Sequence, residues 1–161
     1  ANKDFKIRMI DQTLEQIGVM DKNFKFFSTA HQSHYQISMN MFWDNPVFGK
    51  GPKTFRKYCS DEKFKVEFEA SCSTHPHNFY LQWLVETGLI GLLLFLCYVF
   101  FIFKFIIKKI DNPLSILSLI ILIILFWPIM STGSLLKNQM GVSFFYIIGI
   151  CLSLSRIKQK I

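Results

Sequence analysis

Three long apolar runs in the C-terminal half of the chain restrict its fold more than any other feature. The first covers residues 88–107 and is interrupted by a single charged residue, Lys104, near its end. The second and third, residues 113–132 and 139–155, carry no charged residue. A helix needs roughly 17–25 predominantly apolar residues to cross a membrane. We therefore expect an all-α integral membrane protein, a multispanning helical bundle with three spans at about these positions and with Pro128 kinking the second span.

Basic residues are unevenly distributed, and their positions predict the orientation of the spans. Residues 1–87 carry eleven Lys and Arg against ten Asp and Glu, whereas residues 88–161 carry seven Lys and Arg against Asp111 alone. Basic residues that flank apolar runs are typical of the cytoplasmic ends of membrane spans, not of a nucleic-acid-binding surface. We expect a cytoplasmic C-terminus and a mostly helical loop domain, residues 1–87, on the outer side. The inner junctions are marked by Lys104, Lys108, Lys109, Arg156, Lys158 and Lys160.

Residues 1–27 have the pattern of an amphipathic helix followed by a charged linker. Ile10, Leu14 and Ile17 share one face of this helix, and Gly18 ends it. This segment has no features of a signal peptide that would carry residues 1–87 across a membrane. We therefore expect the chain to be the C-terminal part of a larger multispanning protein.

A second helix is predicted from Ser28 or Thr29 to about residue 43, with either residue as its N-cap. His31, His34 and neighbouring aromatic residues recur on one face of this helix. Two histidines one turn apart can bind a metal ion, and His75 and His77 would be the further ligands. No carboxylate or cysteine is fixed beside them, so we expect no metal. The alternative is that this face packs against the loop that carries His77 and lines a cleft.

The segment that follows contains a tight turn with several basic residues. Asn45-Pro46 ends the second helix, and Gly49-Lys50-Gly51-Pro52 forms the turn, after which a short helix begins at Pro52. The spacing excludes a Walker phosphate-binding loop. Lys50, Lys53 and Arg56, with the exposed amides of the turn, form a candidate anion site, and a solvated basic face is the equal alternative.

Residues 59–73 predict a disulfide and a short extended segment. Cys59 and Cys72 lie on either side of a charged loop, and an outer, oxidising location favours a disulfide between them. Phe64, Val66 and Phe68 alternate with charged residues, which indicates a short strand or an extended lid. Sequence alone leaves the pairing of the two cysteines open.

A helix start leads directly into the first apolar run. Thr74 is the expected N-cap and Pro76 suits the first turn. His77 and Asn78 would then lie in the opening turn, where free backbone amides and the helix dipole favour anions.

The same residues carry a resemblance to a known family. His77-Asn78, followed after nine intervening residues by Gly88 and then by Gly91, resembles the signature of the O-antigen ligase and O-antigen polymerase-like membrane glycosyltransferases. The Pro-x-x-Gly-x-Gly segment from Pro46 to Gly51 resembles a second motif of that family. The resemblance spans residues 28–155 and implies a bacterial inner-membrane protein whose active loop faces the periplasm.

The resemblance also implies an activity. The chain would transfer a glycan from an undecaprenyl-diphosphate donor to a hydroxyl of a lipid A-core sugar or of a growing polysaccharide, without metal or other cofactor and without nucleic acid. His77 is expected to act as base or diphosphate contact and Asn78 as its orienting or sugar-binding neighbour, with Glu86 a weaker candidate. The expected substrate or diphosphate ligands are Arg56, Lys53, Lys50, His31, His34 and His75. A non-enzymatic periplasmic binding or assembly module anchored in the membrane is the alternative function.

Overall fold

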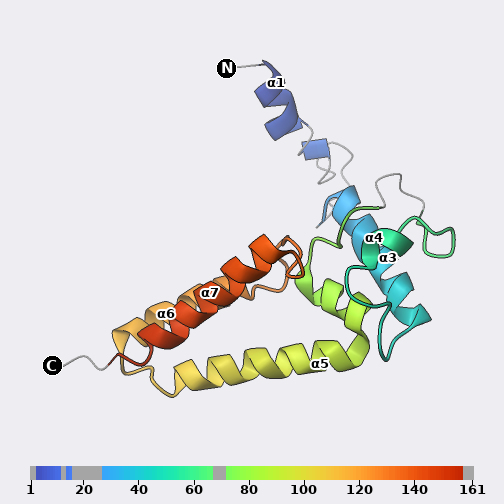
Figure 1. Ribbon diagram of the computed structural model, residues 1–161. Coiled ribbons are helices and arrows are strands. Elements are labelled where there is room, and N and C mark those ends of the chain that lie inside the picture. Colours follow the sequence, from blue (N-terminus) through green and yellow to red (C-terminus); the bar gives the residue numbers. More distant parts are fainter. Residues whose placement is uncertain (1–2, 12–13, 16–26, 67–71, 158–161) are drawn as a thin grey trace.

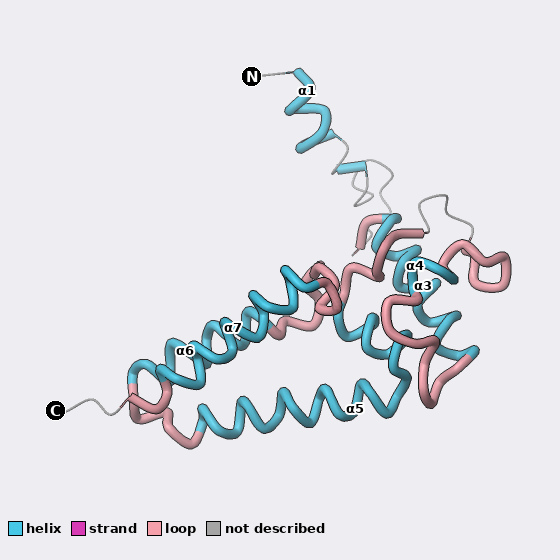
Figure 2. Tube along the Cα trace, in the orientation of Figure 1, coloured by secondary structure: helices cyan, strands magenta, loops and turns pink. Residues whose placement is uncertain are grey.

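The fold is helical throughout the part of the chain that the computed structural model describes, residues 3–11, 14–15, 27–66 and 72–157 (Figure 1 and Figure 2). No strand occurs in these residues, which confirms the all-α prediction for them. Of the short strand or extended lid expected in residues 60–73, the strand does not form in residues 60–66, where the chain makes turns up to Phe64, and residues 67–71 lie outside the described part. The helices are α1 (Lys3–Lys6), the π-helical turn η1 (Ile7–Asp11), α3 (Thr29–Asp44), α4 (Phe55–Tyr58), α5 (Phe79–Ile107), α6 (Pro113–Leu125) and α7 (Asn138–Leu154).

The N-terminal amphipathic helix corresponds to α1 and η1 in the described residues. The side chain of Ile10 is exposed, and Ile17 lies outside the described part. The expected apolar face of this helix is therefore exposed at Ile10.

Helix α3 packs against the first turns of α5, and α4 also contacts α5. Ser28 caps α3 as predicted, because its hydroxyl accepts a hydrogen bond from the amide of His31. One face of α3 contributes Ile37 and Met41 to a small apolar core. A disulfide joins Cys59 to Cys72, whose Cα atoms are 5.2 Å apart, and so fixes the loop after α4 to the segment before α5. The other buried residues of this core are Phe55, Cys59, Phe64 and Val85.

Helix α5 is bent at Gly88, which has φ 67° and ψ −168° (Figure 1). Residues 79–87 pack beside α3, and residues 89–107 continue as a long apolar segment. With a rise of about 1.5 Å per residue, this segment is about 28 Å long, close to the thickness of a bilayer core. Many of its apolar side chains are exposed, as expected for lipid contact, and Leu94 is 68% exposed.

Helices α6 and α7 lie side by side and close against α5 through an aromatic core (Figure 1). The ring of Phe79 makes edge contacts with those of Phe95, Phe126 and Phe144. Of the described helices, α5 alone is long and apolar enough to cross a membrane, and α6 and α7 are shorter apolar helices.

The predicted kink at Pro128 is wrong, because α6 ends at Leu125 and Pro128 lies in the loop that follows. Proline lacks an amide donor and would clash with the carbonyl four residues earlier, so the helix ends before it. The loop that results, residues 126–137, returns to the start of α5.

Candidate functional site

All four histidines of the sequence meet around His77. The centroid of its ring lies 5.8 Å from that of His31, 5.3 Å from that of His34 and 4.4 Å from that of His75. His31 and His34 come from one face of α3, whereas His75 and His77 lie in the segment just before α5. The prediction that this face of α3 packs against the loop carrying His77 is confirmed. We call these four residues the histidine cluster.

The backbone at His77 differs from the expected helix start. Asn78, not Thr74, is the N-cap of α5, because its side-chain oxygen accepts a hydrogen bond from the amide of Leu81 at 3.1 Å. His77 therefore precedes the helix, with φ 55°, a backbone conformation that side chains other than glycine seldom adopt. The hydroxyl of Thr74 lies 2.9 Å from Nδ1 of His75 instead of capping the helix.

The loop after α6 holds the start of α5 in place. The amide of Thr132 donates to the carbonyl of His77 (2.8 Å), and the Thr132 hydroxyl accepts from the amide of Phe79 (3.0 Å). The side-chain amide of Asn78 donates to the carbonyl of Pro128 (2.7 Å). Most of the first amides of α5 thus donate to groups within the fold. Few of them are left to bind an anion, which is the role that the sequence predicts for them.

Two histidines of the cluster have both ring nitrogens in hydrogen bonds. His31 contacts the hydroxyls of Ser28 (2.8 Å) and Ser131 (3.1 Å). His75 donates from Nε2 to the carbonyl of Thr132 (3.2 Å), and its Nδ1 lies within hydrogen-bond distance of the Thr74 hydroxyl. Nε2 of His75 therefore carries a proton, because a carbonyl can only accept, whereas a hydroxyl can either donate to Nδ1 or accept from it.

His77 differs from these two, since neither of its ring nitrogens makes a hydrogen bond to any residue that the structure describes. Partial burial lowers the pKa of His77 below its ordinary value, and the positive charges of His31 and Lys137 lower it further. The pKa of His75 is also lowered, first by burial and then by the charge of His77. A neutral imidazole with an unengaged nitrogen is able to accept a proton near neutral pH.

Lys137 is a cation of the site that the sequence did not assign to it. It is the N-cap residue of α7, exposed to solvent, and its charge acts on both His75 and His77. The signal that pointed to it was weak, namely a single basic residue in a polar loop between two apolar runs.

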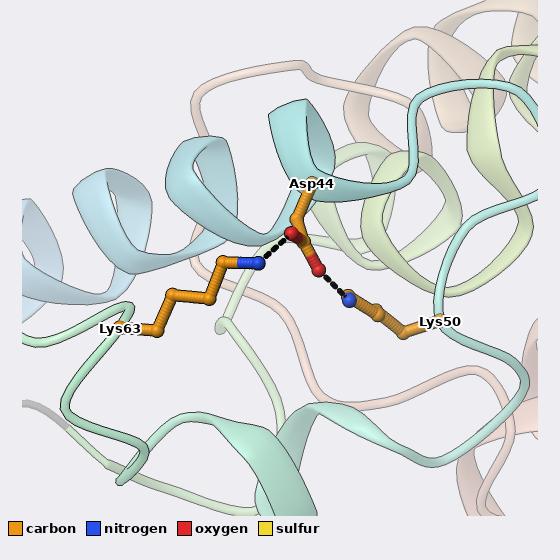
Figure 3. A network of polar contacts seen from close by, with 3 residues as sticks. All are labelled: Asp44, Lys50 and Lys63. Atoms are coloured by element: carbon orange, nitrogen blue, oxygen red, sulfur yellow. Dashed lines mark hydrogen bonds and ion pairs between the residues drawn. The ribbon is translucent and has the colours of Figure 1, made fainter.

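The three basic residues of the turn do not join the histidine cluster. Lys50 pairs with Asp44, which also pairs with Lys63 (Figure 3), and these two lysines hold the pKa of Asp44 below its ordinary value. Lys53 and Arg56 are exposed, and no hydrogen bond links them or Lys50 to a histidine in the described part of the chain. Lys50 therefore already has a carboxylate partner, which it shares with Lys63, and its role as a diphosphate ligand stays a prediction.

The turn and the bend of α5 interlock through four backbone hydrogen bonds. The amides of Lys50 and Gly51 donate to the carbonyls of Val85 and Glu86 at 2.8 and 2.9 Å. In return, the amides of Leu89 and Ile90 donate to the carbonyls of Pro46 and Val47 at 2.8 and 3.4 Å. The close approach of the turn to α5 requires glycine at position 49, because a Cβ on Gly49 would lie 2.5 Å from the backbone nitrogen of Gly88. The helix begins at Phe55, later than the predicted Pro52, because the chain makes this turn first.

Glu86 stabilises the contact between the turn and the bend of α5, and its hydrogen bonds go to residues outside the histidine cluster. Its side chain is 1% exposed, and its carboxylate accepts from the amides of Lys53 (2.9 Å) and Phe55 (3.3 Å). The side-chain amide of Gln82 donates to this carboxylate (3.1 Å) and to the hydroxyl of Ser134 (2.8 Å). A buried carboxylate with these partners positions the turn, so the weaker catalytic assignment of Glu86 is not supported by its geometry.

No group of three His, Cys, Asp or Glu side chains among the described residues is arranged to hold a metal ion. Within the histidine cluster, hydroxyls engage His31, and a hydroxyl and a carbonyl engage His75.

Comparison with known proteins places these features in a family. A family model described as O-antigen ligase matches residues 9–96, more than half of the chain. The match covers both interlocked motifs, the histidine cluster and the start of the apolar segment of α5. No curated protein matches the chain, and no solved structure matches it. The chain thus belongs to the O-antigen ligase family of membrane proteins that act in polysaccharide assembly.

Proposed function

We propose that this chain forms the transfer site of a membrane glycosyltransferase that moves a glycan from undecaprenyl diphosphate to a hydroxyl acceptor, either a lipid A-core sugar or a growing polysaccharide. The observation that carries the proposal is His77, which lies within the residues that match the family model, has a lowered pKa and makes no hydrogen bond from its ring nitrogens to a described residue.

The proposed chemistry assigns the proton to His77. A ring nitrogen of His77 takes the proton of the acceptor hydroxyl as its oxygen attacks the anomeric carbon of the donor sugar. The bond from that carbon to the diphosphate oxygen breaks, and the electron pair leaves with the diphosphate. General-base catalysis of this kind contributes about 10²–10⁴-fold to a rate.

The leaving diphosphate needs positive charge near the histidine cluster. Lys137 is the proposed source, because its charge already acts on His75 and His77. The exposed side chains of Lys53 and Arg56 remain candidates for the distal phosphate, whereas Lys50 is occupied by Asp44. The proposed reaction needs no metal ion, since these cations stabilise the leaving group.

Asn78 is proposed as a positioning residue and not as a sugar ligand. Its side-chain oxygen caps α5 and its side-chain nitrogen binds the carbonyl of Pro128, so both polar atoms serve the fold. Asn78 thereby sets the position of the adjacent His77. His31 and His75 hold the ring of His77 between them.

An open apolar hollow of about 540 Å³ adjoins the loop that holds His77. Its lining residues come from the last turn of α6 and from the loop that follows, and the next residue of that loop, Ser131, contacts His31. We propose that the lipid part of the donor enters from this side, with residues 1–87 in the periplasm and the C-terminus in the cytoplasm of a bacterial cell. The hollow is lined by Ile123, Ile124, Trp127, Ile129 and Met130.

A transfer assay tests the proposal. The complete protein in proteoliposomes is mixed with a purified undecaprenyl-diphosphate oligosaccharide and candidate acceptors, with and without chelator. We expect transfer by the wild type and by Lys65→Ala, an exposed control, and transfer reduced by at least about 100-fold in His77→Ala. Chelator should have no effect. Wild-type protein that binds the donor and transfers nothing would instead support a non-enzymatic assembly module.

A further inference from the structure

The turn between α3 and α4 carries exposed apolar side chains that neither the fold nor the proposed reaction uses. Trp43 is 71% exposed, Phe48 is 72% exposed and Val47 is 49% exposed. Trp43 lies in the last turn of α3, and the other two lie in the turn that docks on α5. Three neighbouring apolar side chains in water at the end of a small helical domain need an explanation.

Backbone hydrogen bonds fix the level of this turn along α5. The carbonyls of Pro46 and Val47 accept from the amides of Leu89 and Ile90, the first two residues after the bend (Figure 1). The turn therefore cannot slide along the helix. It lies at the outer end of the long apolar segment.

The length of the apolar segment places that end at the membrane surface. From Leu89 to Lys108 there are 19 residue steps, which give about 28 Å at about 1.5 Å per residue. The hydrocarbon core of a bilayer is about 30 Å thick, and lysines mark its boundary at the Lys108 end. Leu89 and the turn must then lie at the opposite boundary, where Trp and other aromatic residues are enriched.

The side chains around the turn change from apolar to charged, as expected for a segment that lies between lipid and water. Leu89 and Ile90 are exposed and continue the lipid-facing surface of α5 up to Val47 and Phe48. The ion pairs that Asp44 makes with Lys50 and Lys63 lie at the base of the same turn (Figure 3).

We propose that this turn is a membrane-surface anchor, with Trp43, Val47 and Phe48 inserted into the lipid of the outer leaflet. The anchor would fix α3, and with it His31 and His34, at a set height above the bilayer. The proposal requires that α5 crosses a membrane and does not depend on the reaction catalysed, so it can fail or succeed separately from the proposed function.

Depth measurement with a spin label tests the anchor. Phe48→Cys is labelled with a nitroxide in the complete protein, with the free cysteines, including Cys97 and Cys151, replaced by alanine. The protein is placed in nanodiscs of phosphatidylethanolamine and phosphatidylglycerol. Collision with oxygen, which concentrates in lipid, is compared with collision with a water-soluble nickel chelate. Leu94→Cys serves as the lipid reference and Lys57→Cys, on the exposed side of α4, as the water reference.

We expect the label at position 48 to collide more with oxygen than with nickel, with a ratio between those at positions 94 and 57. Trp43→Cys should give the same result and guards against a local effect of one substitution. A ratio at both positions equal to that at position 57 would overturn the proposal. Shielding from both reagents would also overturn it, because another protein segment would then cover the turn.

Discussion

Replacement of Gly88 by alanine tests the interlocked contact between the turn after α3 and the bend of α5. Gly88 has φ 67° and ψ −168°, a region open essentially to glycine, and a Cβ there would run into the carbonyl of Val47. The backbone strain costs about 1–3 kcal/mol. Displacement of the turn would also remove the hydrogen bonds to the amides of Leu89 and Ile90, each worth about 0.5–1.5 kcal/mol net. The free energy of unfolding should therefore fall by about 2–6 kcal/mol.

Gly149→Ala is the matched control, because it makes the same chemical change in another apolar helix. A Cβ at Gly149 meets no atom within 4 Å, and alanine favours a helix over glycine by up to about 1 kcal/mol. Thermal unfolding in detergent, followed by intrinsic fluorescence, should show Gly88→Ala with a Tm lower by roughly 10 °C. Gly149→Ala should match or exceed the wild-type Tm. Equal Tm values for the two variants would refute the interlocked turn.

Four further predictions concern the groups around the interlocked turn and the histidine cluster. Glu86→Ala leaves two backbone amides without their buried acceptor and should lower the free energy of unfolding by about 2–4 kcal/mol, measured by the same thermal assay. Cys59→Ser opens the disulfide and should cost about 2–4 kcal/mol, and wild-type protein treated with reductant should reproduce its Tm; an unchanged Tm would contradict the structure. His75 and His77 have pKa values lowered in the folded state, so the unfolded chain binds more protons as the pH falls below about 6.5. Stability should therefore be full above that pH and decline as the pH falls through the folded pKa values, and a Tm that rises on acidification would exclude this reasoning. Lys137→Ala removes a positive charge and should raise the pKa of His77, measured by NMR titration, whereas Lys65→Ala should leave it unchanged.

Local signals in the sequence predicted the parts of the fold that local physics decides. Ser28 caps α3 because a hydroxyl at that position can reach an early amide, and the helix then runs to Asp44, one residue from the expected end. The histidines of α3 fell on one predicted face because helical spacing places them there. Their meeting with His77 followed from the expectation that this face packs on the next segment.

The errors arose where contacts distant in sequence decide the outcome. Thr74 and Asn78 are both acceptable N-caps, and the loop after α6 selects Asn78 through Pro128, fifty residues later. The same loop brings Lys137 to the cluster, which no local pattern indicates. The pairing of Lys50 with Asp44 was not predicted, because it depends on the path of the turn between them.

The central claim is that His77 accepts the proton of the acceptor during transfer. It is tested most directly by the transfer rate at saturating lipid-linked donor, measured across pH for the wild type and His77→Ala. The account predicts a wild-type rate that rises with pH to a plateau, with an apparent pKa below about 6.5, because transfer needs neutral His77. His77→Ala should lose that dependence and at least about 100-fold in kcat, with a smaller change in KM for the donor. A variant that keeps the wild-type kcat and loses only donor affinity would contradict the claim and leave His77 as a binding residue.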